Sequence, residues 1–473
     1  MKNRLRSAVA FGAAVVVLAA AALSAAGPVG AVPVSVDFPA FMHDAGHSGY
    51  SSDATAIAPS TPLNLAWTFQ EVHKKNFPPR FFSTPLVISH VIYEGSNTGN
   101  FYAFDLATGT ILWQKYLGVE PAITCKQLGF LATAASGIDP TTGVLTIYAA
   151  SGDGNIYALR ASDGTILWTS PVNVPDPGTN DYFTYSSPEI ANGKIYVGIS
   201  SECDQPSSPI TVRGGLAELD QATGNRLATY YSVPADQIGG DIWSSPAVAA
   251  DGSVFVATGD GFGQSATDTQ AIVHLDGNTL ARIDSWQIVP DKDNDFGGSP
   301  TIFNATINGV STPMVGACNK NGNYYALRQS SLSAGPVWTA KISGKNATGN
   351  CLSTAVWNGS NLFVGGPTAI IKKVTYRGSM YKLDPATGKM IWKVGLPEAL
   401  VQSPTMDGAG AIAAASYDLQ SATNTAFLID ASTGAFRLVD DGNAPAASSP
   451  VFADQSLVIA TARGEILVYN AGA

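Results

Sequence analysis

Three aspartates stand close together in the segment PDKDNDFGGSP, at Asp291, Asp293 and Asp295. Neighbouring carboxylates raise one another's affinity for protons, and this property suits a general base that removes a proton from a substrate. A solvated acidic loop is the alternative interpretation of the same residues. The segment is therefore a first candidate for acid–base chemistry.

Four further stretches carry polar or aromatic residues that a plain structural repeat does not need. A polar insertion, VGISSECDQPSSPITVRGGLAELD, contains Glu202 and Arg213. The other three are GGDIWSSPAV with Trp243, FVATGDGFG with Asp260, and GACNKNGNYYAL with Lys320 beside a cysteine. The structural alternatives are an exposed hairpin loop, inner-strand packing, a Gly-Asp turn and a surface lysine, respectively.

A repeated pattern must position these residues. FYAFDLATGTILWQ is followed by IYALRASDGTILWT, LAELDQATGNRLATY and MYKLDPATGKMIWK, with weaker copies between and after them. Each copy has a strand of period-two alternation, a turn with Asp or Asn and Gly, and a strand that ends in Trp. An apolar strand precedes this pair, and a strand led by STP, SSP or GSP precedes most copies. Four strands per unit and no helical period indicate small antiparallel sheets.

The spacing of the copies predicts an all-β fold, an eight-bladed β-propeller. The Trp positions or their equivalents recur roughly every 46–60 residues, which is close to the period of a four-stranded blade. The last copy reaches Asn470 before its final strand, and LNLAWTF at Leu63–Phe69 supplies the missing strand. Closure of the ring in this way removes an open sheet edge. We expect the repeated Trp side chains to pack between blades rather than to bind a cofactor.

The amino-terminal sequence and the composition limit where the protein works. A basic start, an apolar run and a small-residue site predict a signal peptide at residues 1–31, and an uncleaved membrane anchor is the alternative. Residues 32–62 form a leader segment and residues 63–473 the propeller, with no other run that spans a membrane. The formal charge of −10 argues against nucleic acid as a partner. We therefore expect a secreted, extracellular protein.

Four cysteines in an exported chain suggest two disulfide bonds. Three pairings are open, and we favour Cys318–Cys351, which lie in consecutive repeats, with Cys125–Cys203. Their spacing matches no zinc site and no CxxCH haem attachment.

The blades ending in the pattern of FYAFDLATGTILW, with the leader FMHDAGHSGYSSDATAIAPSTPLNLAWTF, resemble the pyrroloquinoline quinone (PQQ) repeat proteins from about Phe41 to Asn470. This superfamily includes quinoprotein alcohol dehydrogenases and scaffold proteins that bind no quinone, so the fold does not settle the function. For His43 and His47 in the leader, the resemblance implies a loop that packs across the propeller face rather than a metal site.

The resemblance assigns a role to each candidate residue. Glu202 and Asp260 correspond to calcium ligands, and a carboxylate at position 260 is a suitable oxygen ligand. Trp243 corresponds to the aromatic floor beneath the quinone. Asp295 corresponds to the catalytic base and is also a candidate metal ligand. Lys320 corresponds to the cation that contacts the quinone oxygens. Arg213 would clamp the cofactor or pair with Glu202.

The sequence also departs from the alcohol dehydrogenases. Their two adjacent cysteines and following arginine are replaced by AITCKQLGF, which has a single Cys125 and one cation, Lys126. No haem module is present in the sequence, so electrons would pass from a small alcohol or polyol to a separate acceptor. The alternatives are a propeller that has lost the cofactor and binds a protein or glycan, and a hydrolase or lyase on the same fold.

Overall fold

The structure is a computed structural model. It describes residues 37–72, 77–120, 128–172, 182–201, 212–261, 268–290, 293–343, 351–418, 421, 423–439, 442 and 444–472. Residues Ser35–Ala473 form one compact unit. One short 3₁₀ helix, η1 (Leu332–Ala334), accompanies the strands of the described part. None of the described helical residues form a segment that could cross a lipid bilayer.

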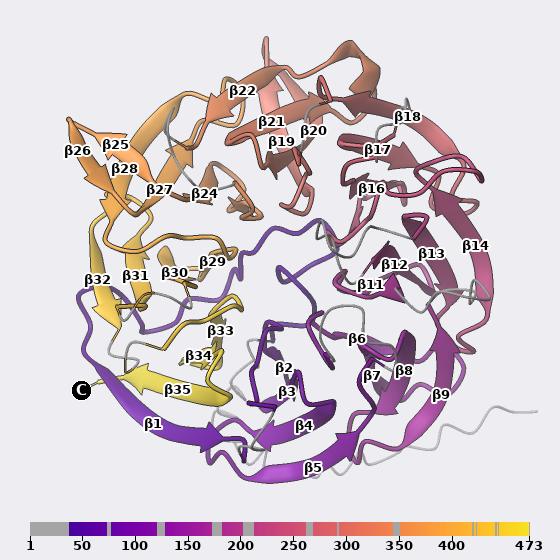
Figure 1. Ribbon diagram of the computed structural model, residues 1–473. Coiled ribbons are helices and arrows are strands. Elements are labelled where there is room, and N and C mark those ends of the chain that lie inside the picture. Colours follow the sequence, from indigo (N-terminus) through magenta and orange to yellow (C-terminus); the bar gives the residue numbers. More distant parts are fainter. Residues whose placement is uncertain are drawn as a thin grey trace, which may run out of the picture. The chain divides into compact units, whose positions relative to one another are not determined.

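Eight antiparallel sheets, the blades, follow one another around a ring (Figure 1). Blades 1 and 2 are β2 (Leu86–Ile88), β3 (Val91–Gly95), β4 (Asn100–Asp105) and β5 (Ile111–Tyr116), then β6 (Ala135–Ile138), β7 (Leu145–Ala150), β8 (Asn155–Arg160) and β9 (Ile166–Pro171). Blades 3 and 4 are β10 (Tyr182–Phe183), β11 (Glu189–Ala191), β12 (Lys194–Ser201), β13 (Gly215–Asp220) and β14 (Arg226–Tyr231), then β15 (Ala247–Val248), β16 (Val254–Ala257), β17 (Ala271–Leu275) and β18 (Arg282–Gln287). Blades 5 and 6 are β19 (Thr301–Ile307), β20 (Val310–Asn319), β21 (Asn323–Arg328) and β22 (Trp338–Lys341), then β23 (Val356–Trp357), β24 (Leu362–Gly366), β27 (Gly378–Leu383) and β28 (Met390–Leu396). Blades 7 and 8 are β29 (Thr405–Met406), β30 (Ala411–Ala415), β31 (Ala426–Asp430) and β32 (Phe436–Val439), then β33 (Val451–Ala453), β34 (Ser456–Ala460), β35 (Glu465–Ala471) and β1 (Leu63–Gln70).

Blade 8 confirms the predicted closure of the ring. Its outermost strand, β1, pairs antiparallel with β35, with Trp67 opposite Val468. The first strand and the last strand of the propeller therefore share one sheet, and this pairing covers the edge that β35 would otherwise expose.

The repeated Trp and the repeated turn dock onto each other between neighbouring blades. In blade 1, Asp105 Oδ1 accepts hydrogen bonds from the backbone and hydroxyl of Thr108, and Gly109 closes the turn at φ 71°. A Cβ atom on Gly109 would lie 2.7 Å from the indole of Trp67 in blade 8. The Trp67 Nε1–H donates to the Leu106 carbonyl at 2.8 Å. The repeated Trp side chains therefore pack between neighbouring blades, as the sequence predicted.

The strand-leading SSP motifs form a ring of hydroxyl groups around the central channel. Each blade contributes one buried Ser or Thr, and in seven of the eight steps the backbone N–H of one donates to the hydroxyl oxygen of the next at 2.8–3.2 Å. We call this set the hydroxyl ring; its members are Thr84, Thr133, Ser187, Ser245, Ser299, Thr354, Ser403 and Ser449. Every donor–acceptor pair joins two different blades, so the ring fixes the inner strands relative to one another.

The leader crosses the inner strands from blade to blade (Figure 1). Backbone hydrogen bonds join it to six blades, at Val87, Ser136, Val248, Ile302, Trp357 and Met406. His47 is fully buried, and its Nδ1 lies 2.8 Å from the Pro300 carbonyl oxygen. The leader therefore packs across the propeller, in agreement with the interpretation from sequence.

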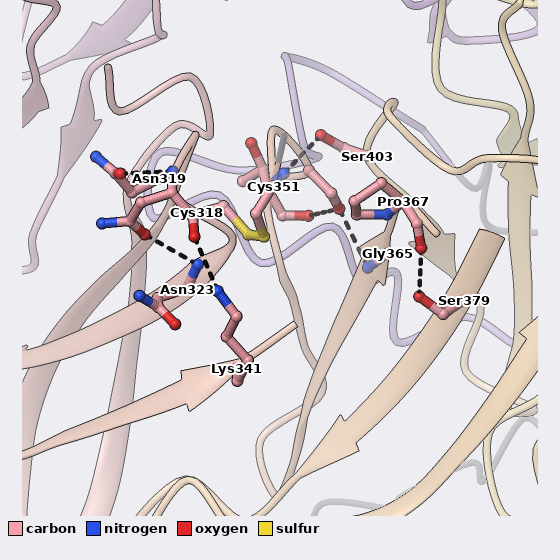
Figure 2. The surroundings of a disulfide bond; sticks show 12 residues. Cys318, Asn319, Asn323, Lys341, Cys351, Gly365, Pro367, Ser379 and Ser403 are labelled. Carbon is pink, nitrogen blue, oxygen red and sulfur yellow. Dashed lines mark hydrogen bonds between the residues drawn. A yellow bond between two sulfur atoms is a disulfide. The ribbon is translucent and has the colours of Figure 1, made fainter. Parts of the chain in front are cut away.

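A disulfide bond joins blade 5 to the segment that enters blade 6. Cys318 on β20 pairs with Cys351, with Cα atoms 5.1 Å apart (Figure 2). This confirms one favoured pairing. Cys125 and Cys203 lie outside the described residues, as does the predicted signal peptide.

Blade 6 departs from the repeat. Between β24 and β27 it carries an extra hairpin, β25 (Ala369–Ile371) and β26 (Val374–Tyr376). The two strands pair with each other and pack against β28.

Candidate active site

A cavity of about 470 Å³ lies at the centre of the ring. The hydroxyl ring forms one level of its wall. The residues two positions earlier in each blade form a second level, because side chains two apart share a strand face. This level is largely apolar and consists of Phe82, Leu131, Tyr185, Trp243, Gly297, Leu352, Val401 and Ala447. The remaining described lining residues are Phe41 of the leader, Arg80, Leu128, Ser244, Gln402 and Tyr417, and no carboxylate lies among the described residues that line the cavity.

Trp243 is the blade 4 member of this second level, which explains why it does not sit at a blade-docking position. Its indole lies over Gly297 of blade 5, where an added Cβ would come within 2.3 Å of the ring. Gly297 therefore makes room for the Trp243 ring, which forms a flat aromatic wall of the cavity.

Asp295 and Lys320 meet beside Trp243. The Lys320 Nζ lies 2.6 Å from Asp295 Oδ2 and 5.6 Å from the centroid of the Trp243 ring. Lys320 also pairs with Asp293, whose side chain is 65% exposed, whereas that of Asp295 is only 6% exposed. The Lys320 backbone N–H donates to the Asp295 carbonyl at 2.9 Å, so the two residues are held together by main chain and side chain.

The charge on Lys320 is stabilised by its two neighbours. Burial on its own would lower the pKa of Lys320, but Asp295 and Asp293 outweigh burial and raise that pKa above its ordinary value. Lys320 is thus a fixed cation next to an aromatic ring.

Asp260 reaches Asp295 through its backbone. Its N–H donates to Asp295 Oδ1 at 2.7 Å, so both oxygens of Asp295 have donors. The Asp260 carbonyl in turn accepts from Gly240 at 2.8 Å. Blades 4 and 5 thereby bring Trp243, Asp260, Asp295 and Lys320 together.

Arg213 is directed elsewhere. Its Nε donates to the Val233 carbonyl at 2.9 Å, and its guanidinium lies 3.9 Å from the centroid of the Tyr231 ring. Its backbone is close to the site, because Arg213 bridges Gly239. Its side chain contacts none of Trp243, Asp295 and Lys320.

The predicted metal ligands are only partly within the described residues. Glu202 and Asp291 lie outside them. Among the residues that the structure describes, no three His, Cys, Asp or Glu side chains gather closely enough to hold a metal ion. Glu202 would follow directly after Ser201, whose N–H and hydroxyl both contact Asp241 Oδ2, at 3.0 and 2.5 Å.

Two features of the site escaped the sequence analysis. Asp241 is buried next to the candidate residues, and its backbone carbonyl accepts from Gly259 at 2.8 Å. Its position two residues before Trp243 in GGDIW was the available signal. In the sequence the hydroxyl ring appeared only as the strand-leading SSP motif. A single copy of the motif does not show that the hydroxyl groups of eight blades lie next to one another.

Sequence comparison identifies one family. The model described as "Outer membrane protein assembly factor BamB", a PQQ repeat, matches residues 44–182, 89–292 and 330–473. The polyvinylalcohol dehydrogenase of Sphingopyxis sp. (strain 113P3) is 26% identical over 386 residues, which are 72% of this chain and 56% of that protein. Across the curated relatives it matches, the chain spans between 20% and 56% of their length.

Solved structures of proteins with different names share the fold of this chain. The quinohemoprotein alcohol dehydrogenase of Comamonas testosteroni superimposes with a TM-score of 0.72 at 16% identity, covering 93% of this chain and 81% of that one. BamB of Moraxella catarrhalis superimposes with a TM-score of 0.55 at 15% identity, covering 86% and 100%. At such identities the likeness extends to the fold alone.

Proposed function

Because the chain belongs to the family of PQQ-repeat β-propellers, we propose that it is an exported quinoprotein dehydrogenase that oxidises a small alcohol or polyol. A separate electron acceptor would complete the reaction. The proposal applies the activity named for the relatives to a chain that covers only part of their length, so it depends on the site residues themselves.

The observation that carries the proposal is the contact set of Trp243, Lys320 and Asp295. A flat ring, a fixed cation 5.6 Å from its centroid and a buried carboxylate 2.6 Å from that cation lie next to one another. Trp243 lines the cavity, and Lys320 and Asp295 lie behind its ring, outside the cavity lining. A propeller that serves only as a scaffold has no physical need for this combination.

The described residues fit a flat, polycarboxylated quinone. The cavity of about 470 Å³ has aromatic walls, many hydroxyl donors and Arg80, and no carboxylate among its described lining residues that would repel the ligand. Trp243 would form its aromatic wall, and Lys320 would contact its oxygens. When bound, PQQ supplies a two-electron acceptor for the hydride of the alcohol.

The proposed calcium site depends on three carboxylates. Asp260 and Asp295 are carboxylates of the kind that calcium prefers, and Glu202 is the third proposed ligand. Because the described part contains no three-ligand cluster, we derive no step through a metal.

Asp295 is the proposed general base. An alcohol O–H that donates to Asp295 Oδ2 must compete with Lys320, which lies 2.6 Å from that oxygen. Lys320 can move toward a second acceptor, since its ammonium group also pairs with Asp293. Transfer of its contact from Asp295 to Asp293 and the quinone oxygens would free Asp295 to take the proton.

The experiment is a calorimetric titration of the protein with PQQ, with and without calcium, followed by oxidation assays with an artificial acceptor. We expect the parent to bind PQQ and Asp295→Asn to bind it equally but to lose activity by at least a hundredfold. Equal oxidation rates in the two proteins would remove Asp295 from its role. Failure of the parent to bind PQQ under either condition would overturn the dehydrogenase proposal.

A second candidate is a binding or scaffold propeller with a protein or glycan partner. The match to the family model described as an outer membrane protein assembly factor, and the fold shared with BamB, favour it. The same titration separates the two candidates.

A further inference from the structure

Blade 6 is basic in an otherwise acidic protein. The chain has 26 Lys and Arg against 36 Asp and Glu. Among the described residues of blade 6, from Val356 to Leu396, however, six are basic and only Asp384 is acidic; the basic residues are Lys372, Lys373, Arg377, Lys382, Lys389 and Lys393. Lys341, at the end of the neighbouring outer strand of blade 5, adds a seventh positive charge. Asp384 is engaged in its own turn, where Oδ1 accepts from Thr387 at 2.9 and 2.7 Å. Blade 6 thus presents a local excess of positive charge.

The repeat itself shows that these lysines are not needed for the fold. In the copy FYAFDLATGTILWQ of blade 1, Thr110 and Gln114 occupy the positions of Lys389 and Lys393. Blade 2 has threonine at both positions. Neutral residues therefore satisfy the same turn and outer strand elsewhere in the ring.

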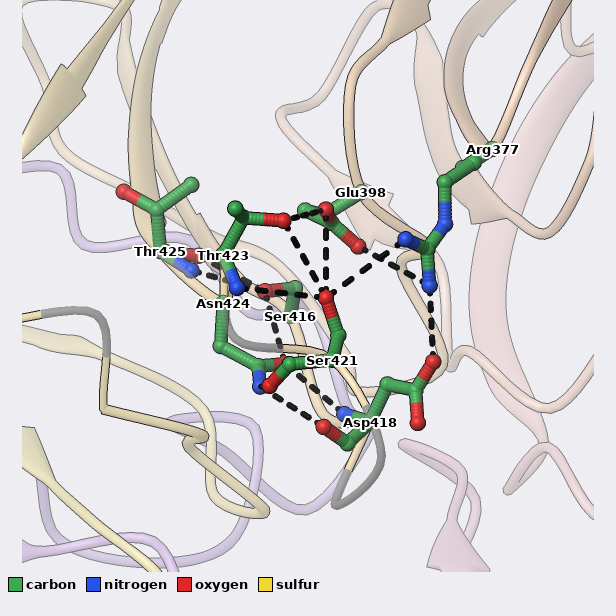
Figure 3. A network of polar contacts seen from close by, with 8 residues as sticks. All are labelled: Arg377, Glu398, Ser416, Asp418, Ser421, Thr423, Asn424 and Thr425. Carbon is green, nitrogen blue, oxygen red and sulfur yellow. Dashed lines mark hydrogen bonds and ion pairs between the residues drawn. The ribbon is translucent and has the colours of Figure 1, made fainter.

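Most of the lysines also lack a neutralising partner. Arg377 is paired with Asp418 at 2.8 Å and with Glu398 at 3.4 Å, in the polar network shown in Figure 3. In contrast, no ion pair among the described residues includes Lys372, Lys373, Lys389 or Lys393, and all four are exposed. Their charge is available to a partner.

The extra hairpin places two of these lysines next to exposed apolar side chains. Lys372 and Lys373 form the turn between β25 and β26, both at positive φ. Ile370 is 56% exposed and Val374 is 51% exposed. Hydrophobic side chains that a fold leaves uncovered beside fixed charges are typical of a protein-binding surface.

A groove of about 480 Å³ lies beside the hairpin, between the outer strands of blades 5 and 6. Lys341 and Lys393 both line it, and Ala369, Ile370, Tyr381 and Met390 contribute to its apolar lining. No Asp or Glu is present among the described residues that line the groove. A ligand that fits this lining combines negative charge with an apolar group.

We propose that the hairpin and this groove bind an acidic segment of another protein, which inserts one apolar side chain between Lys341 and Lys393. Charge complementarity favours an acidic partner at this surface, because the rest of this acidic protein repels such a partner. The exposed Ile370 and Val374 favour a protein over a polyanionic polymer, because a polymer bound by charge alone would use only the lysines. The proposal is independent of the dehydrogenase function.

The test uses the full chain and a fluorescent peptide of twelve residues, alternating Asp and Glu around one central Leu. Fluorescence anisotropy measures its affinity at low and moderate salt. The variant K389T/K393Q carries the residues that blade 1 has at the same positions, so it should fold normally. Lys115→Gln on the outer strand of blade 1 is the matched control.

We expect K389T/K393Q to weaken peptide binding about tenfold, the effect of losing two exposed ion pairs, and Lys115→Gln to leave it unchanged. Replacement of the central Leu by Ser, or of the acids by Asn and Gln, should also weaken binding. No binding of the acidic peptide at low salt, or equal affinity for parent and variant, would overturn the proposal. Binding of phosphatidylglycerol vesicles or of heparin fragments in place of the peptide would overturn it in favour of a lipid or a polyanion.

Discussion

Glu189 makes the stability of the propeller depend on pH in a defined window. It lies on β11 of blade 3, beneath the leader, and is 3% exposed. Its Oε2 is 4.0 Å from Nε2 of His47, which is fully buried. Burial, assisted by the nearby Asp44, raises the pKa of Glu189 from 4.5 to about 8. Burial also lowers the pKa of His47 from 6.5 to about 4. Both groups are therefore neutral in the folded protein near neutral pH.

The two shifts act in opposite directions on the unfolding free energy. Between pH 4.5 and 8 the unfolded chain has released the Glu189 proton while the folded one holds it, so stability falls as pH rises. Between pH 4 and 6.5 only the unfolded chain binds a proton on His47, so stability increases as pH rises. The two effects cancel from pH 4.5 to 6.5. Above 6.5 only Glu189 acts, and at about 1.4 kcal/mol per pH unit the loss reaches about 2 kcal/mol by pH 8.

The substitution Glu189→Gln keeps the size of the side chain and removes its charge. Unfolding of parent and variant by denaturant at intervals of half a pH unit gives the difference between them, which cancels the effects of other buried acids such as Glu94. We expect the stability of the parent relative to the variant to decline steadily from pH 4.5 to 8. The variant, which lacks the Glu189 carboxyl group, should gain stability from pH 4 to 6.5, whereas the stability of the parent should change little from pH 4.5 to 6.5. A difference that does not change with pH would refute the assignment of a buried, protonated Glu189.

Three other perturbations test the fold and the site. Trp113→Ala removes the indole that packs on Gly164 and should cost about 3–5 kcal/mol of unfolding free energy, measured by denaturant titration; a cost below 1 kcal/mol would contradict its docking role. Replacing Cys318 and Cys351 by Ala opens a loop with a sequence separation of 33 residues and should cost about 3–4 kcal/mol; the reduced parent should match the double variant, and an unaltered melting temperature would argue against the bond. Gly297→Ala forces the Trp243 ring to move, since the added Cβ would lie 2.3 Å from it, and should weaken PQQ binding in calorimetry at least tenfold, whereas Gly359→Ala, a surface turn with no atom near its Cβ position, should bind normally.

The fold could be predicted because the sequence repeats the pattern of one blade many times. Seven copies, a truncated eighth copy and one displaced strand were enough to predict eight blades and the pairing of Leu63–Phe69 with the last copy. Trp67 was the decisive residue, because the final copy ends before its outer strand and Trp67 lies at the Trp position of that missing strand. The hairpin of blade 6 was not predicted, because it occurs once and its sequence, AIIKKVTY, has no counterpart in the other copies.

The proximity of four candidate residues was predictable, and their roles remain predictions. Asp295, Lys320, Asp260 and Trp243 come from segments far apart in sequence, and they meet because blades 4 and 5 are neighbours in the ring. Arg213 shows the limit of this reasoning. Its backbone lies where the motif places it, but Tyr231 and the Val233 carbonyl hold the side chain away. A motif fixes a position in a strand or loop, and only the neighbouring side chains fix a rotamer.

The hydroxyl ring has a consequence for the connectivity of the chain. Its hydrogen bonds all run in one rotational sense, so each blade that takes part in two of them is a donor toward one neighbour and an acceptor toward the other. The bond from Ser449 of blade 8 to Thr84 of blade 1 continues the series across the blade in which the two ends of the propeller sequence meet. The opening of the polypeptide in blade 8 is therefore only one of several possible choices. Circular permutants that join the present ends by a linker and begin between any two other blades should regain the same ring. The order of the blades in space, rather than their order of synthesis, would then determine the native state.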